Sequence, residues 1–261
     1  MKPIRVRKMI SDRIWQALEP AVTAAKHSAA GAPPDLTDRE FVQAVLCLNR
    51  TGCPWRDLPA ALGGLHALPA LGGARRLAAP VEKSPSRAFC PGTGAVHGFE
   101  DGARASPCGW HAKKNGPQQA LGRSRGGLTT KIHAASINEN CSVALHLTPG
   151  QAHDGRNFES PYESLDSDNV LESAALDKGY DADRIRERLA LDGIQPVIPP
   201  LSTRCKKLHY DKAPYGERNR VERFFNKLKE FRRMAARYGK LQKTFCAALH
   251  LVAAFLIARN S

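Results

Sequence analysis

Residues 215–233, YGERNRVERFFNKLKEFRR, carry the pattern on which the interpretation of the whole chain depends. At about 100° per residue in a helix, one stripe of this segment is polar and another, roughly 120° away, is apolar. The polar stripe holds Tyr215, Arg218, Glu222, Asn226 and Lys229, and the apolar stripe holds Val221, Phe224, Phe225, Leu228 and Phe231. We therefore predict an amphipathic helix that buries one face and presents the other.

The polar stripe has a single carboxylate, Glu222, surrounded by cations and a phenol. An ordinary solvated face gives the same amphipathic pattern. A lone acid among Arg and Lys side chains also suits a carboxylate that binds a metal ion beside phosphates.

The spacing of Tyr215, Arg218, Glu222 and Lys229 resembles the Tyr-Arg-Glu-Lys signature of bacterial insertion-sequence DDE transposases. The resemblance covers residues 11 to about 62 and 113 to 258. It implies an α/β fold, a ribonuclease-H-like mixed sheet with flanking helices. It also implies a small helical DNA-binding domain at 1–62 and a catalytic core at 113–261. Between them the resemblance fails, and we expect an anomalous segment of low order at 63–112.

Composition points to a polyanionic partner. The 261 residues are 42% hydrophobic, an ordinary globular composition that argues against disorder throughout, and 39 Lys and Arg against 25 Asp and Glu give a net charge of +14. A GC-rich gene can also inflate arginine content without any nucleic-acid role. The seven cysteines form no CxxC pair, and no apolar run is long enough to span a membrane. We expect a bacterial cytoplasmic, nucleoid-associated protein.

The N-terminal region predicts two helices. Ile14, Trp15 and Leu18 have helical spacing, and Thr37 to Glu40 form a capping box before a second apolar stripe. The following TGCPWRDLP turn, 51–59, resembles a family element, and we interpret Trp55 and Leu58 as core anchors.

The second half alternates strands and helices. Residues 128–135 and 143–148 predict a β-hairpin, with His133 and His146 as sheet residues. Residues 173–176 predict a short buried strand, 182–191 a helix and 195–198 another strand. The apolar stripe over 241–256 predicts a helix that packs across the sheet.

Asp177 follows the buried strand, where α/β folds bind ligands. The segment Asp177-Lys178-Gly179-Tyr180-Asp181 matches the family's DKxYD motif, which implies that Asp177 is the second catalytic acid. An Asp at a strand end can instead cap a helix, and Asp181 or Asp183 could do so here. His153 in Gln151-Ala152-His153-Asp154 either lines the cleft or makes a loop hydrogen bond.

Residues 69–112 show no sustained period of 2 or 3.6, although the family would place its first catalytic Asp on a central strand there. Back-translating Ser106 to His111 and reading one nucleotide later permits Ala-His-Ala-Ala-Gly-Met, which resembles family text. His97-Gly98-Phe99 read likewise permits Met-Asp-Ser. Our hypothesis is that 69–112 are translated out of frame, so that the central strand is lost or irregular. Within the frame as it stands, the nearby acids are Glu100 and Asp101.

The resemblance implies metal-dependent cleavage of insertion-sequence ends and strand transfer to target DNA, with two Mg²⁺ or Mn²⁺ ions. It implies metal binding by Asp177 and Glu222, catalytic roles for Tyr215, Arg218 and Lys229, and a homo-oligomer that holds double-stranded terminal repeats and target DNA. The missing first Asp predicts that this chain is inactive. The alternative is a catalytically dead DNA-binding remnant. The expected DNA-binding residues are Arg123, Arg125, Arg220, Arg223, Lys227, Arg232 and Arg233.

Overall fold

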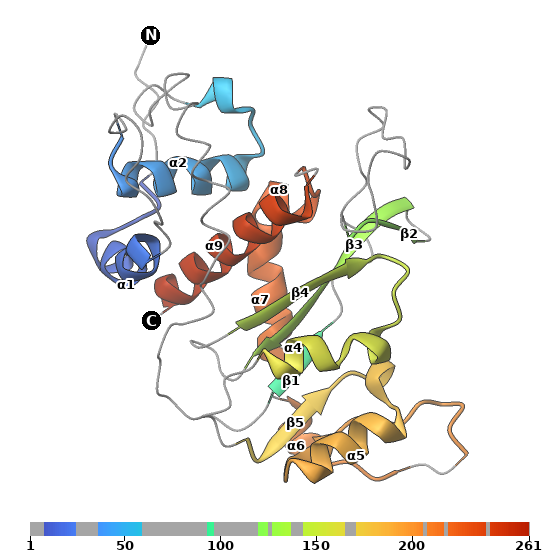
Figure 1. Cartoon of the computed structure of the whole chain (residues 1–261). Coiled ribbons are helices and arrows are strands. Elements are labelled where there is room, and N and C mark those ends of the chain that lie inside the picture. The colour runs from blue at the N-terminus through green and yellow to red at the C-terminus, as the bar shows by residue number, and fades with distance from the viewer. Residues whose placement is uncertain are drawn as a thin grey trace. The chain divides into compact units, whose positions relative to one another are not determined.

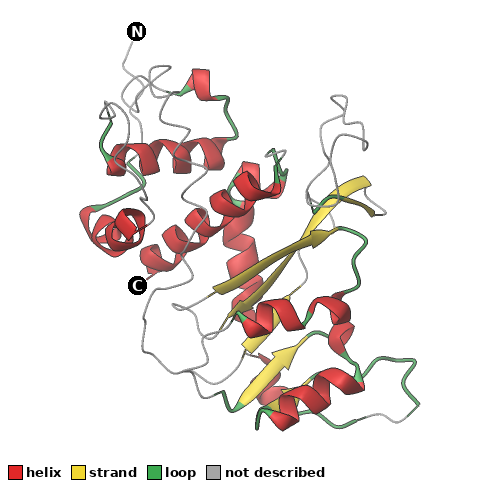
Figure 2. Cartoon of the chain, viewed as in Figure 1, coloured by secondary structure: helices red, strands yellow, loops and turns green. Residues whose placement is uncertain are grey.

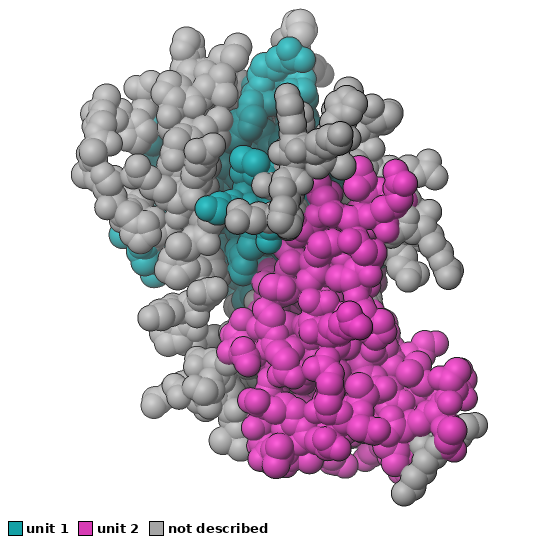
Figure 3. All heavy atoms as spheres, turned by 45° about the vertical axis from the view of Figure 1, so that its right-hand side comes forward, with its two compact units in different colours: residues 1–84, 228–261 teal, residues 85–227 magenta. Residues whose placement is uncertain are grey.

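The computed structural model describes residues 8–24, 36–58, 93–96, 120–124, 127–136, 143–164, 171–205, 208–216, 219–238 and 241–260. The chain divides into two compact units, one formed by 1–84 with 228–261 and the other by 85–227 (Figure 3). The first unit thus joins both ends of the chain. The three-part division expected from the sequence, 1–62, 63–112 and 113–261, stays a prediction.

Helices make up the described part of the first unit (Figures 1 and 2). The long C-terminal helix α9 packs against α1, α2 and α8, whereas its apolar pattern predicted packing on the sheet. Its buried residues lie around most of its circumference, which suits a helix with neighbours on several sides. The elements are α1 (Asp12–Ala24), α2 (Asp38–Thr51), η1 (Trp55–Asp57), α8 (Arg232–Ala235) and α9 (Gln242–Asn260).

The predicted start of α2 is confirmed in atomic detail. Thr37 Oγ1 accepts a hydrogen bond from the Glu40 backbone N–H at 3.3 Å, and Glu40 Oε2 accepts one from the Thr37 N–H at 2.9 Å. The helix ends at Gly52, whose φ of 77° is a left-handed conformation that favours glycine. Both ends of α2 are therefore encoded locally.

Side chains from the two ends of the chain meet where α2 packs on α8. Arg50 Nη2 lies 3.5 Å from Glu230 Oε2, and the Arg50 guanidinium carbon lies 6.0 Å from the centroid of the Phe231 ring. A Cβ at Gly52 would lie 3.4 Å from Cβ of Arg232, so the C-terminus of α2 approaches α8 closely. Leu58 is buried with Trp55 packed beside it, which confirms both as core residues.

The second unit contains a mixed sheet, so the predicted α/β class is confirmed (Figures 1 and 2). The strand order is β2-β3-β1-β5-β6, and β4 pairs with Thr130–Ser136 of β3. β3 runs antiparallel to β1, β2 and β4, and β5 runs parallel to β1 and β6. The β3–β4 pairing confirms the predicted hairpin. The strands are β1 (Thr93–Val96), β2 (Gly122–Ser124), β3 (Gly127–Ser136), β4 (Val143–Pro149), β5 (Ser173–Leu176) and β6 (Gln195–Val197).

The expectation that residues 69–112 supply no regular central strand is wrong for Thr93–Val96. This segment is β1, which pairs with β3 through Gly94 opposite Ser136 and with β5 through Ala95 opposite Leu176. Backbone pairing needs no particular side chains, so a segment without an apolar period can still close the gap between two strands. The rest of 69–112 lies outside the described residues.

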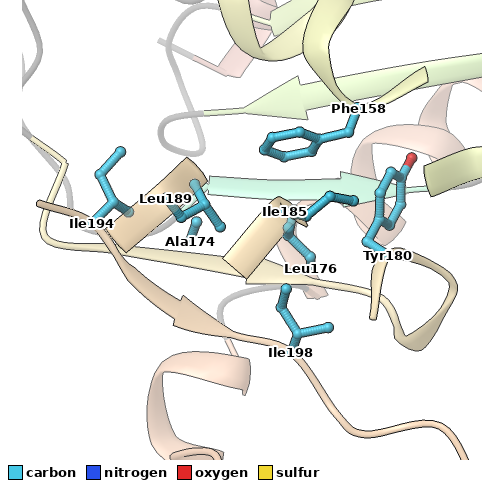
Figure 4. Close-up of a cluster of buried hydrophobic side chains, with 8 residues drawn as sticks. All are labelled: Phe158, Ala174, Leu176, Tyr180, Ile185, Leu189, Ile194 and Ile198. Atoms are coloured by element: carbon cyan, nitrogen blue, oxygen red, sulfur yellow. The ribbon is translucent and has the colours of Figure 1, made fainter. Parts of the chain in front are cut away.

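A hydrophobic cluster between β5 and α5 (Asp183–Leu191) forms one core of this unit (Figure 4). Ile185 and Leu189 project from α5 toward the strand, and all four residues of β5 are buried. A strand covered in this way has no polar alternation. The cluster comprises Phe158, Ala174, Leu176, Tyr180, Ile185, Leu189, Ile194 and Ile198.

The predicted continuous helix over 215–233 is wrong. The described residues of this segment form α6 (Lys212–Tyr215), α7 (Asn219–Lys229) and α8 in place of one helix. Phe231 between α7 and α8 has φ −91° and ψ 99°, is fully buried, and packs its ring 6.1 Å from that of Phe255. Burial of this ring on α9 thus overrides the local helical pattern.

We predict that Leu189→Ala destabilises the chain by about 2–5 kcal/mol, since it removes a fully buried side chain and leaves a cavity. Leu191→Ala, two residues later on the same helix, is the matched control because Leu191 is 83% exposed. Chemical denaturation followed by circular dichroism measures both. Equal effects of the two substitutions would contradict this packing of α5.

Candidate functional site

Asp177 lies at the C-terminal end of β5, as predicted. Its side-chain Oδ1 accepts the Lys178 backbone N–H at 2.8 Å, and its carbonyl accepts the Tyr180 N–H at 2.9 Å. These bonds close the short turn η7 (Lys178–Tyr180), of which Asp177 is the cap. Since β1 runs parallel to β5, the chain leaves β1 at the same sheet edge. Asp177 is half-buried there.

Tyr180 anchors η7 in the core. Its side chain is fully buried, and its ring meets Phe158 edge-on with centroids 6.3 Å apart. Its hydroxyl lies 3.2 Å from His133 Nδ1, and His133 Nε2 lies 2.8 Å from Thr148 Oγ1. Burial raises the pKa of the Tyr180 hydroxyl, and the negative charge of Asp177 adds to the rise. The phenol therefore stays protonated at neutral pH.

His133 and His146 are confirmed as sheet residues, facing each other across β3 and β4 with ring centroids 6.3 Å apart. His146 Nδ1 lies 3.0 Å from Ser160 Oγ on α4 (Glu159–Glu163), and burial lowers the pKa of His146. Each ring is thus held by hydrogen bonds within the fold.

Asp181, the last residue of the DKxYD segment, anchors a loop and is not the N-cap of α5, which is Ala182. Its carboxylate accepts hydrogen bonds from Arg186 at 2.8 Å, Arg204 at 3.0 Å and the Leu201 N–H at 2.8 Å. Burial by itself raises the pKa of Asp181, but these donors outweigh burial and lower the pKa below its ordinary 3.8. The carboxylate fastens residues 198–204 against the start of α5.

The Gln151-Ala152-His153-Asp154 segment packs beside η7. Lys131 Nζ on β3 lies 2.9 Å from both Asp154 Oδ1 and the Ala152 carbonyl oxygen. The turn η6 (Asp154–Asn157) contacts η7. His153 is exposed, and its carbonyl accepts N–H bonds from Arg156 and Asn157, which agrees with the loop interpretation of this residue.

Glu222 lies on the exposed face of α7, as predicted. Arg223 and Lys229 are also exposed on this helix, while Val221, Phe225 and Leu228 are buried. The amphipathic pattern is therefore confirmed for α7.

Tyr215 does not share a continuous helix with Glu222, since it ends α6. Its ring meets that of Tyr210 edge-on at 5.5 Å, and α6 contacts β5 and β6. Arg218 lies outside the described residues. Asp177 and Glu222 belong to the same compact unit. Their sharing of a metal ion stays a prediction.

The expected DNA-binding residues have different surroundings. Arg123 on β2, Arg223 and Arg232 are exposed, and Lys227 is half-buried. Arg233 instead donates to the Cys53 carbonyl at 2.7 Å, and its guanidinium lies 5.6 Å from the Tyr238 ring, so it helps to join α8 to the turn after α2. Arg125 and the Arg220 side chain lie outside the described residues. The DNA contacts themselves stay a prediction.

Among the side chains that the structure describes, no three His, Cys, Asp or Glu residues cluster as a metal site. Glu100 and Asp101 lie outside that part of the chain. Within the described ranges, no helix combines the length and apolar character needed to cross a membrane.

Sequence reasoning missed the anchoring roles of Tyr180 and Asp181. Both belong to the DKxYD segment, in which the family motif indicates a role only for the acid at the strand end, Asp177. The sequence signal for the anchoring role of Asp181 is the presence of Arg186 and Arg204 within the next 23 residues. Spacing in the sequence does not indicate which acid these arginines contact.

Two family models match the chain. Residues 10–68 match a family described as "Putative transposase of IS4/5 family", and residues 174–258 match "Transposase DDE domain". The first match includes α1 and α2, and the second begins in β5 and ends in α9. Both families are transposases, the class that the signature residues predicted.

A relative from Brucella ovis is named "Putative transposase for insertion sequence element IS6501". It is 32% identical over 135 residues, which are 51% of this chain and the whole of the relative. No solved structure matches the chain. The chain belongs to the DDE transposases of insertion sequences, which confirms the family predicted from its sequence.

We predict that Asp181→Asn lowers stability at pH 7 by about 3 kcal/mol or more, because it removes the charge of a buried carboxylate that two partly buried arginines contact. Asp183→Asn is the control, since the Asp183 side chain is 71% exposed and contacts only one of these arginines in the salt bridges described.

The same pair of variants has a pH signature. The folded pKa of Asp181 is lowered, so its contribution is complete above the unfolded pKa and is lost as pH falls through the folded pKa. The denaturant concentration at the unfolding midpoint of the unmodified chain should therefore decrease as the pH is lowered below about 4. In Asp181→Asn this midpoint should depend less on pH. An unchanged profile in that variant would contradict the role of the buried carboxylate.

Proposed function

We propose that this chain derives from a metal-dependent transposase that cleaves insertion-sequence ends and joins them to target DNA. The observation that carries the proposal is the position of Asp177, at the end of a buried parallel strand in the unit that also holds Glu222. The mixed sheet, with antiparallel β3 and β4 beside parallel β1, β5 and β6, supports a ribonuclease-H-like arrangement.

Asp177 and Glu222 are the residues that would bind Mg²⁺ or Mn²⁺. Their carboxylate oxygens are the hard ligands that these ions prefer. Asp177 is held in place by its own turn, so its orientation is set before any ion arrives. When bound, two ions activate an attacking hydroxyl and stabilise the leaving oxygen of a phosphodiester.

The excess of positive charge around Glu222 supports DNA as the partner. Residues 201–240 hold 13 Lys and Arg against 4 Asp and Glu, and Arg223 is exposed next to Glu222. Such side chains contact phosphates and position the duplex without reading its sequence. In this proposal Tyr215, Arg218 and Lys229 orient the scissile strand, and a homo-oligomer at the bacterial nucleoid holds the two ends with the target.

The first acid of the catalytic set is absent from the strand on which it belongs. β1 ends at Val96 on the same edge as Asp177, and the chain continues as His97-Gly98-Phe99. Reading the codons of these three residues one nucleotide later permits an Asp two residues after Val96. At about 3.8 Å per residue, that Asp would lie close to the end of β1. The parallel register of β1 and β5 supports the frameshift account for the missing acid, although β1 itself is retained.

We predict that the present chain does not cleave a duplex carrying its element's ends with Mg²⁺ or Mn²⁺, since it lacks one carboxylate. Restoring the shifted reading frame should recover cleavage, and Asp177→Asn in the restored protein should abolish it. Denaturing electrophoresis of labelled ends measures this. Cleavage by the present chain that is lost in Asp101→Ala would show instead that the acid in the existing frame is catalytic.

The alternative, a catalytically dead remnant that binds DNA, shares the same charged surface. We predict that DNA affinity survives Asp177→Asn and falls as salt rises, because binding releases counterions. Arg223→Ala should weaken binding and reduce the slope of log K against log salt by about 1. Arg188→Ala is the control, since Arg188 pairs with Asp192. Binding measured by fluorescence anisotropy that is independent of salt would contradict both functions.

A further inference from the structure

We propose that Tyr180 is a positioning residue for the Asp177 carboxylate and that buried His133 holds the Tyr180 hydroxyl for this purpose. The inference deepens the proposed function and rests on Asp177 being a metal-binding acid. It gives a function to the buried hydrogen bonds that link Thr148, His133 and Tyr180, which strand cleavage does not use directly.

The first link is the turn itself. The Asp177 side chain accepts the N–H of Lys178, and its carbonyl accepts the N–H of Tyr180. The direction of the carboxylate therefore depends on where residues 178–180 lie. Lys178 is exposed and Gly179 has no side chain, so Tyr180 is the residue of this turn that packs into the core.

The second link is the phenol. A ring of this size packed by Phe158, Leu176 and Ile185 would be retained by apolar contacts alone (Figure 4). A buried hydroxyl adds a cost unless it finds a partner. Here the partner is His133 Nδ1, at 3.2 Å. The hydroxyl thus fixes the depth and rotation of the ring, which packing leaves less well defined.

The third link is the sheet. His133 lies on β3, next to Ala134, where β3 is paired with β4 on one side and β1 on the other. Its second ring nitrogen engages Thr148 on β4. A neutral imidazole donates from one nitrogen and accepts at the other, so both contacts are satisfied by one tautomer. The ring is held on both sides, and Tyr180 is fixed to a strand that is itself hydrogen-bonded on two edges.

Together these links connect the hydrogen-bonded sheet to the acid through two residues, His133 and Tyr180. If Tyr180 only filled the core, a ring of the same size without the hydroxyl would suffice at position 180. A positioning role requires the hydroxyl as well, and this difference separates the two in an experiment. Tyr162 provides the matched control, because its ring stacks on Phe158 at 5.0 Å while its hydroxyl contacts Asp192, away from η7.

The first measurement is amide hydrogen exchange in the full chain without metal. Tyr180→Phe should speed exchange of the Lys178 amide and of the amide at position 180 by about three- to tenfold, the loss expected for one hydrogen bond. Thr148→Val, which leaves Tyr180 intact, should give a smaller change of the same direction. Tyr162→Phe should leave both amides unchanged.

The second measurement uses Fe²⁺ with ascorbate and peroxide, which cuts the backbone near a bound metal ion, with the products mapped by mass spectrometry. The chain should be cut near Asp177, and Asp177→Asn should abolish this cut. Tyr180→Phe should reduce it about three- to tenfold, whereas Tyr162→Phe should not.

Unchanged exchange and cutting in Tyr180→Phe, or equal losses in Tyr162→Phe, would overturn the positioning role and leave the metal site standing. If the unmodified chain shows no cut that depends on Asp177, the metal site of the proposed function fails, and the inference fails with it.

Discussion

Parallel pairing of β5 with β1 on one side and β6 on the other is the constraint on which the sheet unit depends. Paired on both edges and covered by α5, β5 has all four of its residues buried, and the buried segment ends at Asp177. A carboxylate is tolerated there because the strand ends and the backbone N–H groups of η7 become available. The placement of the acid is thus a consequence of strand pairing.

Much of the fold was predictable from local sequence. The bounds of Ser173–Leu176 agree with the prediction, since a short run of small and apolar residues bounded by polar ones is typical of a buried strand. The β3–β4 hairpin and the capping box of α2 also depend on neighbours in sequence. The position of Glu222 on an exposed helical face followed from periodicity alone.

Features that depend on distant residues were not predictable. The break before α8 requires the Phe231 ring to reach α9, and local pattern gives no sign of this contact. β1 was missed because Thr93–Val96 contributes backbone pairing and has no alternating pattern. The sequence alone makes Asp181 a candidate helix cap, since its arginine partners are identified only once residues 198–204 fold back over it.

The helical unit has a consequence for the order of folding during synthesis. Arg50 pairs with Glu230, and Cys53 accepts a hydrogen bond from Arg233, so each contact joins residues 180 positions apart. The partners of α1 and α2 in α8 and α9 are therefore synthesised well after them. At 5–20 residues per second, about ten seconds or more pass before α9 is made. During that interval the apolar faces of α1 and α2 have no native partner from α9, so they are open to non-native apolar contacts.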